Sequence, residues 1–201
     1  MNFFEEMLLS YFTKEQLDKI QKTRIVIMGC GGLGSNGAIT LTRTGFKNFI
    51  LIDHDKVEIS NLNRQAYFFN QIGMPKAKAL KENILKINPD CYIEEYVERI
   101  TSENIESFMH KGDIIMEAVD SAQTKALILN TAIKLNKKVV SASGVCGYGN
   151  SEKIKIRRIN NNVSIIGDFE SDNSVFKPYA PKVIAISSLQ CDEILRMVLY
   201  E

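Results

Sequence analysis

The sequence has few of the residues that build metal centres and disulfide frameworks. Its 201 residues include two histidines and four cysteines, and no two cysteines form a CxxC pair. Zinc is therefore not expected, because no cluster of Cys and His ligands is present. Cysteines scattered through a chain with a full apolar inventory indicate reduced thiols inside the cell. On this basis we expect a cytoplasmic protein.

Long apolar runs, export signals and an excess of one charge are also lacking. No apolar run approaches the length that spans a bilayer, and residues 1–10 have no basic region or small-residue cleavage site. The 25 lysines and arginines nearly balance the 24 aspartates and glutamates, so nothing in the composition indicates nucleic acid or a membrane as a partner. Because repeats and linkers are absent, we predict one domain over residues 1–201.

Strand and helix patterns alternate from Arg24 to about Ala142. This alternation predicts an α/β, Rossmann-like fold, in which a mostly parallel sheet has helices on both faces and residues 23–142 form the nucleotide-binding core. Two weaker strands, Ile154–Arg158 and Val163–Ile166, indicate a C-terminal antiparallel extension. The other predicted elements are helices at Lys14–Lys22, Leu33–Thr44, Pro75–Ile87, Ser102–Met109, Ser121–Leu135 and Lys182–Leu199, and strands at Arg24–Met28, Asn48–Ile52, Cys91–Val97, Asp113–Ala118 and Lys138–Ala142.

A glycine motif follows the first predicted strand. Gly29, Gly31 and Gly34 have the GxGxxG spacing and open a helix, and Asp53 follows about 20 residues later. The glycines permit a tight turn and close approach of the backbone to a phosphate, while the start of the helix supplies amide donors. Asp53 is placed to accept hydrogen bonds from ribose hydroxyls. The motif predicts a nucleotide site but does not separate NAD from ATP.

The polar loop after the second strand favours ATP. Residues 61–65 bring amides and the Arg64 guanidinium just past Asp53, and Lys76 lies in the first turn of the next predicted helix. A cation is unfavourable there because of the helix dipole, so Lys76 needs either solvent or an anion. Arg64 and Lys76 together suit a triphosphate better than a nicotinamide. The alternative for Lys76 is a solvated surface lysine.

Asp120 follows a predicted strand and lies at the same edge of the sheet as the glycine motif. A carboxylate at this edge can hold a magnesium ion that bridges phosphates. Asp is also a favoured N-cap, so the alternative is that Asp120 caps the next helix. Lys125, one turn into that helix, either approaches the same phosphates or is exposed.

Together these motifs resemble the ThiF/MoeB/HesA family, bacterial relatives of the ubiquitin-activating enzymes. The resemblance runs from about Phe12 to Leu199 and includes Asn-Leu-Asn-Arg-Gln at 61–65 and Ala-Pro-Lys-Val at 180–183. It implies ATP and Mg²⁺ as cofactors, with ribose at Asp53, phosphates at Arg64 and Lys76, and the metal at Asp120; the last three are the expected catalytic residues. The implied nucleotide site comprises Gly29, Gly31, Gly32, Leu33, Gly34, Asp53, Asp55, Asn61, Asn63, Arg64, Gln65, Lys76 and Asp120.

The resemblance is strongest to short ThiF-type adenylyltransferases, and it implies adenylation of the C-terminal glycine of a ubiquitin-like sulfur carrier such as ThiS, for thiamine thiazole synthesis. It also implies a Gly-Gly end on the carrier, a separate sulfur donor and a homodimer. The attacking α-carboxylate, with a pKa of roughly 3.5, needs no general base, so we interpret His54 as structural or solvated. The sequence names neither the carrier nor the donor.

Three other functions stay open at this point. One is the same reaction on the small subunit of molybdopterin synthase, and another is a non-catalytic scaffold that keeps the fold. The third is an NAD-dependent oxidoreductase, which is disfavoured because little chain remains after Ala142 for a substrate domain.

The chain departs from the family pattern in its metal, arginine and cysteine positions. The paired CxxC zinc motifs of many members are missing, and no arginine precedes Arg24, so the N-terminal arginine role of some relatives is empty or falls to a lysine such as Lys14. Residues 168–181, where some relatives carry a catalytic cysteine, contain none. Cys146 is the nearest candidate, since its glycine-rich surroundings allow exposure, although such cysteines are more often packing residues.

Overall fold

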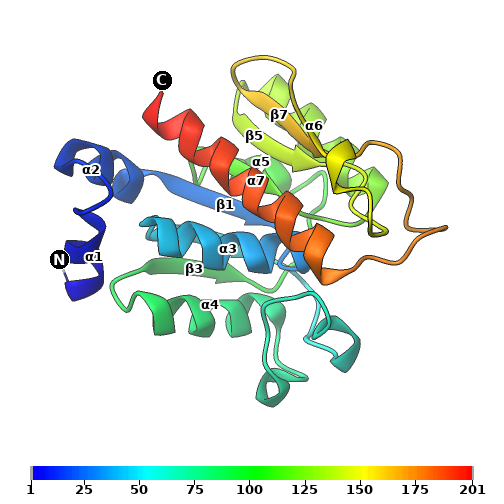
Figure 1. Ribbon diagram of the computed structural model, residues 1–201, viewed down its shortest axis with the longest axis horizontal. Helices are drawn as coiled ribbons and strands as arrows, with labels where there is room; N and C mark the ends of the chain where they lie inside the picture. The colour runs from blue at the N-terminus through cyan, green and yellow to red at the C-terminus, as the bar shows by residue number, and fades with distance from the viewer. Residues whose placement is uncertain (1, 201) are drawn as a thin grey trace.

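The computed structural model describes residues 2–200, which form one seven-stranded sheet with helices on both faces (Figure 1). The strand order is β3-β2-β1-β4-β5-β7-β6, and every pair is parallel except β6 with β7. The predicted α/β, Rossmann-like class and its antiparallel C-terminal extension are therefore confirmed. The strands are β1 (Arg24–Met28), β2 (Asn48–Ile52), β3 (Tyr92–Tyr96), β4 (Ile114–Glu117), β5 (Lys138–Ala142), β6 (Lys155–Arg158) and β7 (Val163–Gly167).

Two buried layers follow from the alternation of side chains along the central strands. Ile25 and Ile27 of β1 point to one face of the sheet, whereas Val26 and Met28 point to the other, and all four are fully buried. The first face packs against α3, α4 and α7, and the second against α5 and α6 (Figure 1). Burial on both sides explains why these strands read as continuous apolar runs.

The helices confirm most of the predicted elements, with small changes at their ends. Thr13 forms a capping box with Gln16 at the start of α2, and Gly45 ends α3 in the left-handed conformation, with φ of 111°. The helices are α1 (Phe3–Leu8), α2 (Lys14–Lys22), α3 (Gly32–Thr44), α4 (Lys76–Ile87), α5 (Ile105–Met109), α6 (Ala122–Lys134) and α7 (Ala180–Leu199), with 3₁₀ turns η1 (Ile59–Asn61), η2 (Phe69–Gln71) and η3 (Ser151–Lys153). No helix within residues 2–200 has both the length and the apolar character of a membrane span.

The strand order creates a switch point between β1 and β4. The chain runs outward from β1 through β2 to β3, and then returns to the other side of β1 with β4. Loops that leave β1 and β4 therefore separate in opposite directions and leave a crevice at the carboxyl ends of these strands, where ligands of such sheets bind. The glycine motif follows β1 and Asp120 follows β4, so the topology brings both to this crevice.

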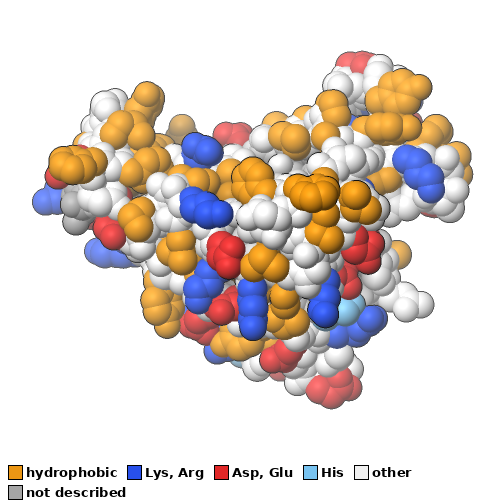
Figure 2. Space-filling view, turned by 90° about the horizontal axis from the view of Figure 1, so that it is seen from below, with side chains coloured by type: hydrophobic (Ala, Val, Ile, Leu, Met, Phe, Trp, Pro, Cys, Tyr) orange, Lys and Arg blue, Asp and Glu red, His pale blue; other side chains and the backbone are white. Residues whose placement is uncertain are grey.

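Charged side chains of both signs are interleaved on the face seen in Figure 2, where no patch of one sign gathers. Apolar side chains are exposed at both ends of the long axis in this view and also across its middle. The exposed apolar residues include Phe3, Met7 and Tyr11 in the N-terminal part and Tyr148 and Val175 in the loops that precede α7. This surface agrees with the near-neutral composition.

The β6–β7 hairpin is fastened to α7 by one buried carboxylate. Glu193 of α7 is fully buried, and it receives hydrogen bonds from Arg158 of β6 at 2.9 Å and from Ser164 of β7 at 2.8 Å. Arg196 makes a further ion pair at 3.0 Å. Burial alone would raise the pKa of Glu193, but these partners outweigh burial and lower its pKa below the ordinary 4.5.

We predict that Glu193→Gln lowers the free energy of unfolding by about 1–3 kcal/mol near neutral pH, because the substitution weakens several charge-assisted hydrogen bonds. A lowered folded-state pKa means that the ionised carboxylate stabilises the fold above its ordinary pKa and loses this effect as the pH falls through the folded value. Urea denaturation should therefore give a smaller difference between wild type and variant at about pH 4.

The matched control is Glu170→Gln. Glu170 pairs with Lys153 at 3.0 Å, but both side chains are more than half exposed, so the same substitution should change stability by less than about 1 kcal/mol. Equal effects of the two substitutions would contradict the role assigned to Glu193.

Candidate functional site

The turn after β1 is built so closely against β4 that it requires glycine. Gly29 has φ of +97°, and a Cβ atom on it would lie 2.7 Å from the carbonyl oxygen of Ala118. A Cβ atom on Gly34 would lie 1.9 Å from the carbonyl oxygen of Gly29. These two glycines therefore fix the shape of the turn and the approach of α3 to it.

The amino end of α3 is free to bind a ligand. Its N-cap, Gly31, supplies no side-chain cap, and within the described residues the backbone amides of residues 31–34 donate no hydrogen bond. Space above Gly31 is open, since a Cβ atom there would meet only Nε2 of Gln65, at 3.9 Å. Free amide donors and the positive end of a 13-residue helix form a ready site for an anion.

Asp53, at the end of β2, holds the glycine turn in place through its carboxylate. One carboxylate oxygen accepts a hydrogen bond from the Cys30 amide at 2.7 Å, and the other accepts one from the Asp55 amide at 2.8 Å. The side chain is buried, although each oxygen keeps a lone pair for a further donor. Asp53 thus orders the glycine turn whether or not it also contacts a ribose.

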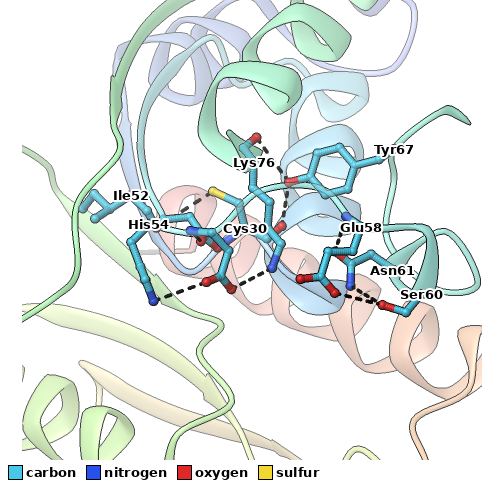
Figure 3. Close-up of polar contacts among 10 residues, drawn as sticks. Cys30, Ile52, His54, Glu58, Ser60, Asn61, Tyr67 and Lys76 are labelled. Atoms are coloured by element: carbon cyan, nitrogen blue, oxygen red, sulfur yellow. Dashed lines mark hydrogen bonds and ion pairs between the residues drawn. The ribbon is translucent and has the colours of Figure 1, made fainter. Parts of the chain in front are cut away.

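Lys76 lies close to this turn and is already paired with an anion. Its Nζ atom lies 2.9 Å from Oδ2 of Asp55, and its side chain is buried, so the alternative of a solvated surface lysine is wrong (Figure 3). His54 contacts the other oxygen of Asp55 at 3.3 Å. Partial burial works to raise the pKa of Asp55, but the hydrogen bond and charge of Lys76 outweigh it and lower the pKa.

The Asn61–Gln65 loop divides into supporting and free residues. The side chain of Asn61 accepts from the Glu58 amide at 3.0 Å, and its backbone carbonyl accepts from the Arg64 and Gln65 amides, so Asn61 shapes the loop. The Arg64 guanidinium contacts only uncharged acceptors, the Ser60 carbonyl at 3.2 Å and Asn63 Oδ1 at 2.8 Å. Within residues 2–200 it makes no ion pair, so its charge is available to an anion.

Gln65 carries an orphaned polar atom beside the open end of α3. The residue is 8% exposed, and its Oε1 atom is buried without a hydrogen-bond partner within the described residues. An unpaired buried acceptor costs free energy, and a ligand with donor groups would satisfy it. The other atom of the same amide, Nε2, lies 3.9 Å from the position of a Cβ atom on Gly31, so the Gln65 side chain borders the open space at the start of α3.

The position of the loop depends on two residues that the sequence reading missed. Asn36 donates to the Arg64 carbonyl at 2.8 Å, and the Ser35 hydroxyl accepts from the Ala66 amide at 3.0 Å. Both lie in the first turns of α3 and so tie the loop to the uncapped amino end of the helix. Their only sequence signal is polarity within an otherwise apolar helix, which does not by itself identify a partner.

Asp120 is exposed at the end of β4 and makes no hydrogen bond or ion pair within residues 2–200. It does not cap α6, because the N-cap is Ser121, whose hydroxyl accepts from the Thr124 amide at 3.3 Å. The neighbouring acid, Glu117, is fully buried and pairs with Lys125. Lys125 is therefore neither fully exposed nor free for phosphates, contrary to both alternatives, while the Asp120 carboxylate remains free.

A second acidic group lies across the crevice. Ligand atoms of Asp53, His54 and Asp55 lie within 4.8 Å of one another. Both carboxylates, however, already accept backbone or lysine hydrogen bonds. We assign no metal to this group.

Cys146 is buried, in agreement with the interpretation of such cysteines as packing residues, although the neighbouring glycines would have allowed exposure. It is 1% exposed, its thiol contacts Asn173 Oδ1, and its carbonyl accepts from Nζ of Lys182 at 2.5 Å. Lys182 also pairs with Asp168, whose pKa falls to about 2 because this bond and backbone amides outweigh burial. Burial raises the pKa of the Cys146 thiol more than the charge of Lys182 lowers it. These contacts are typical of a structural cysteine.

The fold belongs to the Rossmann-like class, with an uncapped helix start and a glycine turn at its switch point. The chain belongs to the ThiF family, whose model matches residues 4–201. It is 34% identical over 173 residues to the adenylyltransferase and sulfurtransferase UBA4 of Candida glabrata, which covers 86% of this chain and 38% of that protein. It is 29% identical over 150 residues to the sulfur carrier protein ThiS adenylyltransferase of Escherichia coli. This match covers 74% of this chain and 59% of that protein.

Solved structures confirm the fold. The E. coli tRNA N6-threonylcarbamoyladenosine dehydratase TcdA, in complex with ATP, superposes with a TM-score of 0.88 at 21% identity and covers 97% of this chain and 93% of that one. The chain thus spans nearly the whole of this neighbour, but only about two fifths to three fifths of the two relatives above. Family and fold are established, while the activity of those longer proteins is a proposal for this one.

We predict that the thiol of Cys146 is unreactive in the folded protein. Because burial keeps it protonated and inaccessible, alkylation by iodoacetamide at neutral pH should be at least about tenfold slower than that of free N-acetylcysteine. Mass spectrometry of tryptic peptides measures the rate, and urea-unfolded protein serves as the reactive control. Native labelling at the rate of a free thiol would restore a covalent role for this residue.

Proposed function

We propose that this protein uses ATP to adenylate the C-terminal glycine of a ubiquitin-like sulfur carrier protein. The observation that carries the proposal is the uncapped amino end of α3, which opens into free space beside Arg64, Gln65 and Lys76. Anionic ligands satisfy free amides and cations together, and a triphosphate has enough charge to engage all of these groups.

The residues fit a nucleoside triphosphate. The amides of residues 31–34 and the free Arg64 guanidinium would receive the phosphates, Asp53 would accept from the ribose, and the orphaned oxygen of Gln65 would gain a donor. Lys76 would exchange its bond to Asp55 for a phosphate oxygen, and water can solvate the Asp55 carboxylate left behind because this side chain is about half exposed. Asp55 and Asn63 border the site, and Asn61 supports it.

Asp120 fits a magnesium ion, since its carboxylate is exposed, unpaired within the described residues and placed at the switch point opposite the glycine turn. When bound, the ion neutralises phosphate charge and orients the leaving pyrophosphate. Hard oxygen ligands suit Mg²⁺, and the structure offers no reason to expect zinc at this position.

The reaction demands little acid–base chemistry from the protein. The α-carboxylate of the carrier has a pKa of roughly 3.5 and attacks as an anion, so positioning and charge neutralisation make up most of the catalysis. A site of amides, Arg64 and Lys76 without a histidine in reach of a reacting group meets this demand. His54 contacts Asp55 instead, in agreement with its interpretation as a structural residue.

The relatives support a protein carrier as the substrate. One is named for adenylation of ThiS and another for combined adenylyl and sulfur transfer, so we propose a ThiS-like partner with a Gly-Gly end, a separate sulfur donor and a homodimer. The interleaved surface charges and a net charge of +1 favour a protein over the tRNA suggested by the name of TcdA. The alternatives are the molybdopterin-synthase small subunit and a scaffold without catalysis.

We predict that Gly31→Ala folds normally but loses ATP affinity about tenfold or more. A methyl group at Gly31 meets no protein atom closer than 3.9 Å, yet it enters the open space above the α3 amides. Isothermal titration with ATP measures the affinity, and thermal melting of the unliganded protein measures the fold. Gly73→Ala is the control for an alanine in open space away from the site, although its φ of +87° adds strain. Unchanged ATP affinity in Gly31→Ala would place the phosphates elsewhere.

We further predict carrier-dependent exchange of labelled pyrophosphate into ATP. Arg64→Ala and Asp120→Ala should each lower the exchange rate by about 10²-fold or more, because each removes a group that neutralises developing phosphate charge. Arg43→Ala and Asp18→Ala are matched controls, since both side chains are exposed and lie on α3 and α2 away from the crevice. The controls should keep wild-type exchange.

Four results would change the proposal or one of its assignments. ATP binding without exchange, for every Gly-Gly-ended carrier of the same genome, would indicate a scaffold. Exchange that requires tRNA instead of a carrier would indicate a nucleic-acid substrate. Binding of NAD but not of ATP would overturn the nucleotide assignment itself. Normal exchange in Asp120→Ala would remove the metal role of that residue.

A further inference from the structure

We infer that the hydroxyl group of Tyr67 is a positioning group that aims the phosphate-binding turn and the start of α4 at the nucleotide. The inference rests on the proposed ATP site, and it adds a residue that lies outside the motif of residues 61–65. Tyr67 itself would not touch the nucleotide, because its ring is buried behind the turn.

One hydroxyl group bridges the two elements that are expected to hold phosphate. The Tyr67 oxygen lies 2.6 Å from the Cys30 carbonyl oxygen, in the glycine turn, and 3.3 Å from the Lys76 carbonyl oxygen, in the first turn of α4 (Figure 3). The residue is 6% exposed. Burial, together with the neighbouring Cys30 and Asp53, raises the pKa of the phenol, so it stays protonated and donates at every pH that the fold tolerates.

The bond to Cys30 decides where the next amide points. In a trans peptide the carbonyl and the following N–H are coplanar and directed oppositely. Because the Cys30 carbonyl points toward Tyr67, the N–H of Gly31 points away from Tyr67, and it donates no hydrogen bond within the described residues. The Cys30 amide is also fixed, by Asp53 at 2.7 Å, so the peptide groups on both sides of Cys30 are held.

The hydroxyl also lies against the backbone of Lys76, as a longer contact that shares its one proton, while the Lys76 side chain can still change partners. The Lys76 amide donates to the Asp55 carbonyl at 2.9 Å, and its carbonyl lies within reach of Tyr67. Backbone anchoring on both sides keeps the Lys76 Cα atom in place when the ammonium leaves Asp55 for phosphate. The backbone of Lys76 is therefore already ordered in the folded protein, which lowers the entropic cost of binding a phosphate.

A purely structural role for Tyr67 makes a different prediction. The ring belongs to the main core cluster, and phenylalanine would fill the same volume. The hydroxyl has one proton, which it donates to the nearer Cys30 carbonyl at 2.6 Å, while the Lys76 carbonyl lies at the longer distance of 3.3 Å. Both carbonyls belong to segments that would approach the proposed ligand. If Tyr67 only packs, Tyr67→Phe changes stability alone; if it positions, Tyr67→Phe weakens contacts with phosphate and spares contacts with the nucleoside.

The test compares ATP and adenosine on the full chain. Dissociation constants are measured by isothermal titration for wild type, Tyr67→Phe and the control Thr42→Val. Thr42 is also fully buried and donates to a backbone carbonyl, that of Ala38 at 2.7 Å, but at the far end of α3. We expect Tyr67→Phe to raise the constant for ATP about 3- to 10-fold, the size of one net hydrogen bond, and to leave adenosine within about 2-fold.

Thr42→Val should lower thermal stability without changing the ratio of ATP to adenosine affinity. Three outcomes would overturn the positioning role. Tyr67→Phe could weaken ATP binding and adenosine binding equally, or it could leave ATP affinity unchanged. Thr42→Val could lower the ratio of ATP affinity to adenosine affinity as much as Tyr67→Phe does. Absence of ATP binding in the wild-type protein would instead contradict the proposed function, so the two failures are distinguishable.

Discussion

The hydrogen bond from the Cys30 amide to Asp53 joins the two strands on which the whole site depends. It connects the turn after β1 with the end of β2 at 2.7 Å, and Gly29 presses the same turn against the end of β4. Three adjacent strand ends are thus locked into one surface. Because this surface is fixed by backbone contacts and buried carboxylate bonds, the free amides of α3 keep their direction without a ligand, which is what preorganised electrostatic catalysis requires.

Two neighbouring acids differ in whether their charge is already paired within the fold. Glu117 is fully buried and held by Lys125 and Ser141, whereas Asp120, three residues later, is exposed without a partner within the described part of the chain. A buried carboxylate must be paired, since leaving it alone would cost several kcal/mol. Lys125 meets this need by pairing with Glu117, whereas Arg64 makes no ion pair within the described part of the chain and Lys76 pairs with the half-exposed Asp55.

The sequence predicted the fold well because the signals were local. Buried apolar runs marked β1, β2 and β5 to the residue, and the Thr13 capping box and Gly45 marked helix ends. The glycine turn was found from its spacing. Pairings across the fold were not predictable, because one sequence does not show which buried lysine meets which carboxylate: the Lys182–Asp168 pair and the burial of Cys146 follow from how residues 143–150 pack beside residues 168–179.

The same reasoning explains why Tyr67 escaped notice while Arg64 did not. A guanidinium within the polar motif of residues 61–65 indicates a site for an anion. A tyrosine two residues after Gln65 gives no such indication, because it is equally typical of a core residue. Its function becomes visible only when the planar peptide after Cys30 is considered, because the hydroxyl on one side of the peptide sets the amide on the other. Buried donors to turn carbonyls would therefore belong to the proposed phosphate site even though they would not touch the phosphate.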